Sequence, residues 1–236
     1  MNTVSQGYIS KELIHFVGRH CKDCDEQYQL LLKILKSGCI SNSEENAKKP
    51  AGVADIEINM PAKISQNEMY IPQMVCFCDI PFEHLEIHLT KYPSFGLGFK
   101  KDFIVKNGGT PVYYIPSEAK ESSIINKGQY FDEKLDKFSY YVSYVIDTKC
   151  QQTLDIIKEI DEFLTFQVFS YVKFFDHNLS DDAPNNYYFE REWRVFGNLK
   201  FSIKNVTTAL IPSGYEGRLS RDCPKFKGKI KTLPHK

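Results

Sequence analysis

The chain has 236 residues, of which 42% are hydrophobic and 25% charged, a composition typical of ordered proteins that excludes wholesale disorder. Thirty Lys and Arg residues balance thirty Asp and Glu residues, so no global charge draws the chain to nucleic acid or to an anionic membrane. No apolar stretch reaches the roughly 20 residues that span a bilayer, and the N-terminal residues lack a signal-peptide pattern. We therefore expect a cytoplasmic protein without membrane contact, whose seven cysteines are mostly free thiols.

The first part of the chain predicts one amphipathic helix among short strands and loops. Residues 13–17 are typical of a short buried strand. Apolar residues at helical spacing predict a helix from about residue 25 to residue 37, and Gly38 follows in the position of a left-handed cap. Residues 41–73 are polar and contain three prolines, which predicts a long surface loop with one short strand at 56–58.

The later part of the chain predicts an alternation of strands and helices. The apolar spacing of residues 153–175 predicts one long, well-buried helix. A shorter helix is expected from Pro81 to Thr90, and strands are expected at 74–77, 95–99, 110–115, 189–197 and 206–211. Strands at both ends with helices between them predict a single α+β domain over residues 1–236, and no glycine-rich phosphate loop is present.

Residues 189–196 carry the most informative chemical pattern. If they form a strand, its period of two places Glu190, Glu192 and Arg194 on one face, with the two carboxylates about 7 Å apart. One carboxylate of such a pair can hold a substrate while the other deprotonates it or stabilises its charge. The alternative is a solvated edge strand in which Arg194 neutralises its neighbours.

Two further segments contain candidate binding residues. His15 lies within an apolar run and Arg19 follows it, although a lone buried histidine is usually structural. Tyr92 follows the helix expected at 81–90, and Gly96 and Gly98 permit close approach of a ligand or of another strand. Ordinary strand and turn packing is the alternative reading of this second segment.

Cysteine spacing is a weak signal for metal binding. Cys21 and Cys24 have the spacing of zinc ligands, and Cys76 with Cys78 offers two more thiols. The second pair lies within a predicted strand, where core packing competes for the side chains. No metal site is therefore predicted, and a thiol- or zinc-dependent redox protein is the weakest of the alternatives.

The order of several motifs resembles that of the bacterial abortive phage-resistance proteins of the AbiGi type. The motifs are ISKELIHFVGR at 9–19, VCFCDIP at 75–81, YPSFGLGF at 92–99, TPVYYI at 110–115 and EREWR at 190–194. The same layout is more distantly similar to the ADP-ribosyltransferase fold, in which an early His or Arg, a central aromatic residue and a late Glu surround NAD. This second resemblance implies a mixed, split β-sheet core with flanking helices.

The likeness to ADP-ribosyltransferases also implies that NAD is bound as the substrate. His15 would hold the adenosine-side ribose, and Tyr92 or Phe95 would stack on the nicotinamide. Arg19 or Arg194 would offset the charge of the pyrophosphate.

The same likeness implies catalytic roles for the two glutamates of the EREWR motif. Glu192 would bind the nicotinamide-ribose hydroxyl and stabilise the oxocarbenium ion, because an ionised carboxylate there offsets the positive charge that builds up on the ribose. Glu190 would orient or activate the acceptor. On this reading Glu192→Gln abolishes activity and costs little stability, since the side chain would lie on a polar face.

Two classes of function follow from these resemblances. The first is an NAD-dependent ADP-ribosyltransferase, acting as the toxin of an abortive-infection system on a nucleic acid or protein acceptor. The alternative is a non-catalytic antitoxin or phage-sensing partner that docks through the 41–73 loop and through tyrosines such as Tyr140, Tyr141 and Tyr144. A toxin harms its host when expressed alone, whereas its neutralising partner does not.

Overall fold

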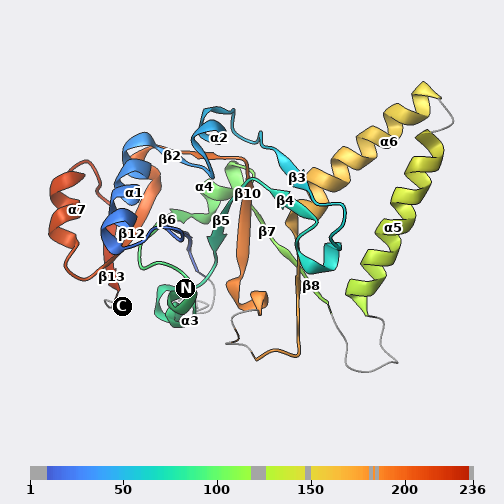
Figure 1. The fold of residues 1–236 in the computed structure, drawn as a ribbon. Coiled ribbons are helices and arrows are strands. Elements are labelled where there is room, and N and C mark those ends of the chain that lie inside the picture. The colour runs from blue at the N-terminus through green and yellow to red at the C-terminus, as the bar shows by residue number, and fades with distance from the viewer. Residues whose placement is uncertain (1–9, 118–125, 147–149, 181–182, 184–185, 234–236) are drawn as a thin grey trace, which may run out of the picture. The chain divides into compact units, whose positions relative to one another are not determined.

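The computed structural model describes residues 10–117, 126–146, 150–180, 183 and 186–233 (Figure 1). Over these residues the chain forms an α+β fold with a mixed sheet and seven α-helices, which confirms the predicted class. It divides into two compact units. Unit 1 comprises Met1–Asp55, Gln73–Pro111 and Glu190–Lys236, and unit 2 comprises Ile56–Pro72 and Val112–Phe189. The expectation of one domain over residues 1–236 concerns how the units join, and it stays a prediction.

Unit 1 is built on a seven-stranded mixed sheet with the order β13-β12-β6-β1-β5-β10-β7. Only β12 and β13 are parallel, and the other neighbouring pairs are antiparallel. Its strands are β1 (Glu12–Phe16), β5 (Met74–Cys78), β6 (Gly96–Lys100), β7 (Thr110–Pro111), β10 (Glu192–Phe196), β12 (Val206–Pro212) and β13 (Lys229–Leu233). A separate short pair joins β2 (Cys39–Ile40) to β11 (Leu199–Lys200).

The helices of unit 1 are mostly short and follow or precede its strands. They are α1 (Cys24–Ser37), α2 (Glu44–Lys48), α3 (Glu86–Lys91), α4 (Lys101–Lys106) and α7 (Glu216–Asp222), with 3-10 turns at Phe82–His84 and Ile203–Asn205. The helix expected from Pro81 to Thr90 is therefore a 3-10 turn followed by α3. No helix of the described residues has the length and apolar character needed to cross a membrane.

The strand register assigns side chains to the two faces of the sheet. Ile14 pairs with Cys78, and Cys78 pairs with Glu192, so these three side chains share a face. Leu85 and Leu89, from the α3 region, pack near them, and we call this the α3 face. The alternate residues of the same strands point to the other side, which we call the α1 face.

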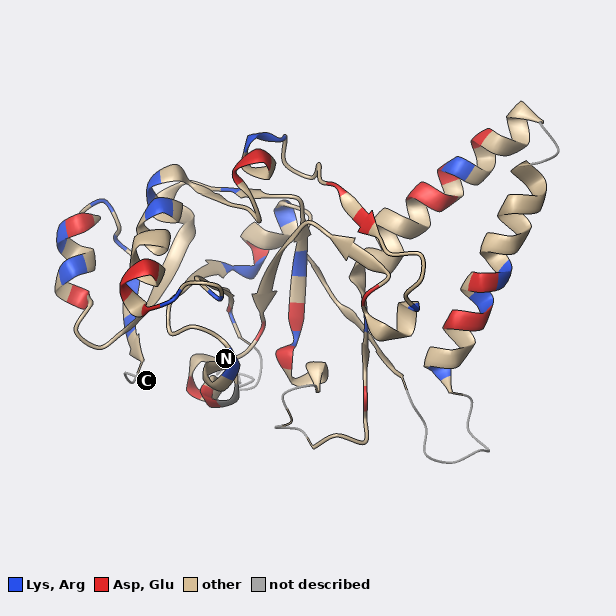
Figure 2. Ribbon diagram, viewed as in Figure 1, with Lys and Arg blue, Asp and Glu red and all other residues tan. Residues whose placement is uncertain are grey.

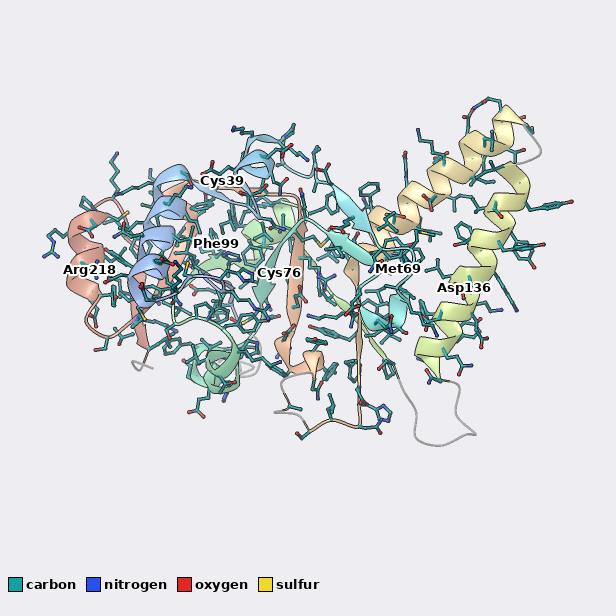
Figure 3. All side chains as sticks on the ribbon, viewed as in Figure 1. Cys39, Met69, Cys76, Phe99, Asp136 and Arg218 are labelled. Atoms are coloured by element: carbon teal, nitrogen blue, oxygen red, sulfur yellow. The ribbon has the colours of Figure 1, made fainter. Side chains whose placement is uncertain are left out.

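The α1 face carries the larger hydrophobic core. Leu13 and Phe77 from the sheet pack there with Leu31 of α1 and Leu219 of α7. Phe99, labelled in Figure 3, lies in this core without exposed surface. Its ring meets the Phe77 ring edge-on, with the ring centroids 6.0 Å apart. Buried aromatic rings of this kind contribute much of the stabilising apolar burial of a domain.

The boundaries of α1 follow from its capping residues. Asp23 accepts a hydrogen bond from the Glu26 backbone N–H at 2.8 Å, which satisfies a free donor at the start of the helix. Gly38 ends the helix with φ of 66° and donates its N–H to the Ile34 carbonyl at 2.9 Å. The sequence-based prediction of this helix is confirmed to within one residue at its start, and its last residue is the predicted one.

We expect Gly38→Ala to destabilise unit 1 by about 2 kcal/mol or more, because an L-residue is strained at positive φ. A Cβ at Gly38 would also lie 2.5 Å from the Phe201 carbonyl oxygen. Gly52 is the matched control, since its φ is 77° and a Cβ there has no neighbour within 4 Å. Denaturant unfolding should show a loss of about 1 kcal/mol for Gly52→Ala. Equal losses in both variants would mean that the contact with Phe201 relaxes without cost.

Unit 2 surrounds a small core with two strand pairs and two long helices. β3 (Ile56–Ile58) pairs with β4 (Tyr70–Pro72), and β8 (Tyr113–Pro116) pairs in parallel with β9 (Val172–Phe175). The connection from β8 to β9 contains α5 (Lys127–Ile146) and α6 (Gln151–Phe163), then a π-helical turn at Leu164–Val168 and a 3-10 turn at Phe169–Tyr171. A further 3-10 turn spans Ile64–Gln66.

Two further predicted elements differ in the structure. The long helix expected at 153–175 ends at Phe163, and its last residues form β9 instead. Pairing of β9 with β8 buries Val172 and Phe174, so tertiary pairing outweighs the helical spacing. α6 has no buried residue, contrary to the expected burial. The loop expected at 41–73 contains α2, β3, β4 and a 3-10 turn.

Candidate functional site

Five of the residues singled out from the sequence gather on the α3 face of unit 1. We call them the polar cluster, and they are Arg19, Tyr92, Glu190, Glu192 and Arg194. The Tyr92 phenol interacts electrostatically with Arg19 and with both glutamates, and Arg194 binds Glu192 directly. The segments that follow β1 and α3, together with β10 and the turn before it, thus bring together residues up to 175 positions apart.

Tyr92 holds Glu190 through a hydrogen bond. Tyr92 follows α3, and its Oη donates to Glu190 Oε1 at 2.8 Å. The Glu190 side chain is almost inaccessible, at 6% exposure. Burial, and then the adjacent Glu190 carboxylate, raise the pKa of Tyr92, so the phenol keeps its proton at neutral pH. The pair is therefore a buried carboxylate held by a neutral donor.

Arg194 holds Glu192 through a two-point ion pair. The two residues are two positions apart on β10, so their side chains share the α3 face. Arg194 Nε donates to Glu192 Oε1 at 2.9 Å, and its Nη2 donates to Oε2 at 3.3 Å. The exposed fractions of the two side chains are 14% and 9%. A forked guanidinium on a carboxylate is the strongest common geometry for such a pair.

An aromatic stack flanks the Tyr92–Glu190 pair. The ring of Phe16 stacks on Tyr92 at 5.4 Å, and the His88 ring lies 5.9 Å from Tyr92 and 6.2 Å from Phe16. The exposed Arg19 guanidinium covers the Tyr92 ring at 5.4 Å. Burial lowers the pKa of His88 to about 4, against the opposing effect of Glu190, so this imidazole is neutral at pH 7.

Glu190 does not lie on the strand with Glu192. It ends a 3-10 turn at Tyr187–Glu190, and Arg191 follows with φ of 43°, in the left-handed region. The Arg191 carbonyl accepts the Asp79 N–H at 3.1 Å, and β10 begins only at Glu192. The expected strand over 189–196 is therefore wrong in its first three residues, because the backbone turns at Arg191.

Two predicted ligand residues lie away from the polar cluster. His15 points to the α1 face, where its ring contacts Phe77 at 5.7 Å and its Nδ1 donates to the Cys76 carbonyl at 2.9 Å. Burial lowers its pKa. Phe95 is fully buried in the α1-face core, with its ring 5.2 Å from Tyr215. The fold thus separates His15 and Phe95 from the glutamates with which NAD binding would require them to act.

The space opened by Gly98 is filled by neighbouring strands. A Cβ at Gly98 would lie 3.1 Å from Thr208 Cβ and 3.2 Å from Glu12 Oε2. Thr208 also donates to Glu12 Oε2 at 2.7 Å, which fixes these side chains above the glycine. Of the two interpretations of this glycine, close approach of a ligand and close approach of a strand, the geometry favours the strand.

Sequence reasoning missed Phe16, Asp79 and His88 as neighbours of the polar cluster. His88 and Tyr92 are four residues apart at a helix end, so a spacing rule could have paired them. Asp79 is 6% exposed and binds Lys101 Nζ at 2.7 Å, with Arg191 Nη2 at 3.8 Å. These contacts of Asp79 join segments that are separated in the sequence, so no local sequence pattern indicates them.

The chemistry of the polar cluster is dominated by its internal bonds. Glu190 and Glu192 are both buried, and each is bonded to another member of the cluster. A carboxylate that stabilises a cationic substrate must face that substrate. Among the residues that the structure describes, no group of three or more His, Cys, Asp or Glu side chains could hold a metal ion. The geometry therefore favours a structural role for the two glutamates.

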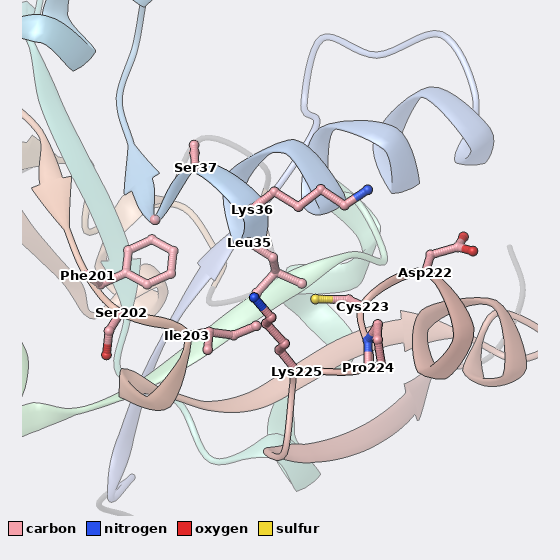
Figure 4. Close-up of a pocket in the computed structure, with 11 residues that line it drawn as sticks. Leu35, Lys36, Ser37, Phe201, Ser202, Ile203, Asp222, Cys223, Pro224 and Lys225 are labelled. Carbon is pink, nitrogen blue, oxygen red and sulfur yellow. The ribbon is translucent and has the colours of Figure 1, made fainter.

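A separate pocket of about 500 Å³ lies in unit 1 at the C-terminal end of α1 (Figure 4). Leu35 and Lys36 line it from α1, Phe201 from the segment after β11, and Cys223 and Lys225 from the segment after α7. Leu35 and Cys223 belong to the α1-face core, so this pocket lies on the opposite side of the sheet from the polar cluster. None of the residues proposed above for NAD lines it.

A family model described as "Putative abortive phage resistance protein AbiGi, antitoxin" matches residues 58–227. The matched segment includes most of the chain and all of unit 2 except its first two residues. It contains the polar cluster except Arg19, and His15 also precedes it. The resemblance to the AbiGi type is thus confirmed. No curated protein and no solved structure matches the chain.

The prediction of an NAD-dependent ADP-ribosyltransferase toxin is wrong. The matching family is described as an antitoxin, which agrees with the non-catalytic alternative. The geometry supplies a physical reason, since His15 and Phe95 lie on the α1 face while Glu190 and Glu192 are buried and bonded within the α3-face cluster. NAD binding followed only from the likeness to ADP-ribosyltransferases, and it stays an untested prediction.

Proposed function

Because the chain belongs to the AbiGi family of abortive phage-resistance antitoxins, we propose that it neutralises a cognate toxin protein by binding it directly. The observation that carries this proposal is a concentration of exposed apolar side chains on α5 and α6, within the matched segment. More than half of the large hydrophobic side chains that are exposed in the described part of the chain lie on these two helices. Exposed patches of this kind mark interaction sites in proteins.

The N-terminal half of α5 is anchored in unit 2. Phe131 and Leu135 pack against the core, and the Phe131 ring meets Phe174 edge-on at 5.6 Å. Asp132 accepts hydrogen bonds from Ser65, at 2.7 Å from its Oγ and 3.1 Å from its backbone N–H. This half of α5 therefore fixes the direction of the helix, and Asp136, labelled in Figure 3, follows the anchored residues.

The remainder of α5 presents tyrosines to solvent. Tyr140, Tyr141 and Tyr144 are 66%, 63% and 67% exposed, and the rings of Tyr140 and Tyr141 contact each other at 5.8 Å. Tyrosine is enriched at protein interfaces because it adds a large apolar area and a polar end with few rotatable bonds. These residues support a protein partner better than a buried small-molecule site, which would need a concave lining.

A growth assay tests the proposal. Expression of this chain alone should leave host growth unchanged, while expression of the cognate toxin alone should arrest growth. Co-expression should restore growth, and Tyr140→Ala/Tyr141→Ala/Tyr144→Ala should weaken that rescue. Tyr113→Ala/Tyr188→Ala is the matched control, because these tyrosines are 62% and 58% exposed but lie outside α5. Growth arrest by this chain alone would overturn the proposal.

Two narrower expectations are separate from this function. An ADP-ribosyltransferase-like sheet stays a prediction about the fold, and the proposed neutralisation does not depend on it. The choice of Glu190 and Glu192 as key residues also stays a prediction. Their bonded, buried geometry supports a role in holding unit 1 together.

A further inference from the structure

α6 carries a stripe of exposed apolar side chains along one side. Ile156, Ile160 and Phe163 are 52%, 44% and 58% exposed. Their spacing of four and three residues places them above one another on a single helix face. We call these three residues the α6 stripe. An i, i+4, i+7 set of anchors is the pattern by which a helix inserts into an apolar groove of another protein.

Acidic side chains border the α6 stripe. Asp155 and Glu159 are exposed, are four residues apart, and follow the helix beside it. α6 also carries Asp161 and Glu162 but only one cation, Lys158 (Figure 2). Lys158 Nζ lies 3.9 Å from Glu162 Oε1. The whole chain is neutral, so this negative field is local to the helix.

From this charge and shape we infer that the α6 stripe is the docking surface for the toxin, and that the toxin offers an apolar groove rimmed by Lys or Arg side chains. The inference rests on the proposed antitoxin function and adds the partner's chemistry. A second copy of this chain is disfavoured as the occupant, because a two-fold contact between α6 stripes would bring Asp155 and Glu159 of both copies together. A basic rim instead pairs with these carboxylates and steers the encounter.

A binding titration with the purified toxin of the growth assay tests this inference. Ile160→Ala/Phe163→Ala keeps strong helix formers in α6. It should raise the Kd for the toxin by about 30-fold or more, as loss of interface anchors does. Asp155→Lys/Glu159→Lys should slow association by about tenfold at low salt and much less at high salt. Val53→Ala/Val105→Ala is the matched control, since these residues of unit 1 are 48% and 54% exposed.

The outcomes separate the inference from the function on which it rests. If the toxin binds the wild-type chain and the two α6 variants equally, the α6 stripe is not its docking surface, and the antitoxin function still stands. If Asp155→Lys/Glu159→Lys associates with the toxin as fast as the wild-type chain at low salt, the inference that the toxin groove has a basic rim is wrong. Self-association of the wild-type chain that the Ile160→Ala/Phe163→Ala variant abolishes would assign the stripe to a second copy and overturn the inference. Growth rescue without binding of the wild-type chain would overturn direct neutralisation itself.

Discussion

Replacing Arg194 with methionine is expected to lower the free energy of unfolding of unit 1 by about 3 kcal/mol. The substitution keeps an unbranched side chain but removes the guanidinium that binds both oxygens of Glu192. Both side chains are largely inaccessible, so water compensates the carboxylate poorly once the cation is gone. Removing one partner leaves an uncompensated charge in the protein interior. The stability lost in this way is far larger than the net stability that the intact pair provides over two apolar side chains.

Trp193 provides the measurement, because it is the only tryptophan of the chain and packs against the α1-face core of unit 1. Its fluorescence during denaturant unfolding follows unit 1 alone. Arg194→Met/Glu192→Gln should recover part of the loss, since it removes both charges. Lys33→Met is the exposed control, because the Lys33–Glu44 pair is 66% and 83% exposed, and it should cost far less stability than Arg194→Met. Equal losses for Arg194→Met and Lys33→Met would contradict the burial argument.

The same geometry corrects the stability expected for Glu192→Gln. A carboxylate on a polar, solvated face could be replaced by an amide at little cost, but Glu192 is 7% exposed and accepts two hydrogen bonds from Arg194. An amide can accept only one of them and leaves the guanidinium charge unbalanced. Loss of function in this variant would therefore report on folding as well as on any chemistry of the carboxylate.

Elements with strong local signals were predictable from the sequence. α1 has an N-cap aspartate, an apolar stripe and a left-handed glycine. Its first residue differs from the predicted one by a single position, and its last residue is the predicted one. β3 lies at the predicted residues 56–58, and β12 differs only by the addition of Pro212. In these segments the local preference and the tertiary environment agree, which is why periodicity was sufficient.

Long-range pairing accounts for the elements that the sequence misplaced. Residues 172–175 continue the apolar spacing of α6, yet pairing with β8 makes them a strand. The turn at Arg191 places a residue other than glycine at positive φ. The sequence of this segment is typical of one continuous strand and does not indicate such a turn. Its carbonyl binds the Asp79 N–H, a contact between segments more than a hundred residues apart.

The candidate site shows the same limit. The period of two correctly placed Glu192 and Arg194 together, because that relation lies within one strand. Whether His15 joins them depends on the register between strands, and Ile14, not His15, pairs with Cys78 on the α3 face. A shift by one residue would have reversed this result, and no feature of a single strand fixes that register.

His88 predicts a strong pH dependence of the stability of unit 1. Its pKa is about 4 in the folded protein, chiefly because burial disfavours the charged ring, and about 6.5 in an unfolded chain. Between these values the unfolded chain binds the additional proton, so stability is complete above pH 6.5 and falls as the pH falls toward 4. The expected loss between pH 7 and pH 4.5 is about 2 to 3 kcal/mol from this one group.

His88→Phe isolates this contribution, because it keeps a planar ring beside Phe16 and Tyr92 but cannot take up a proton. Denaturant unfolding followed by Trp193 fluorescence at pH 7 and at pH 4.5 should show a stability difference smaller by about 2 kcal/mol in this variant than in the wild type. The two proteins differ only at this ring, so the comparison cancels contributions to the pH dependence that they share. His84→Gln, at an exposed histidine of the same region, is the matched control. An unchanged pH dependence in His88→Phe would mean that the buried imidazole finds compensation for its charge, and that the aromatic stack tolerates a cation next to Glu190.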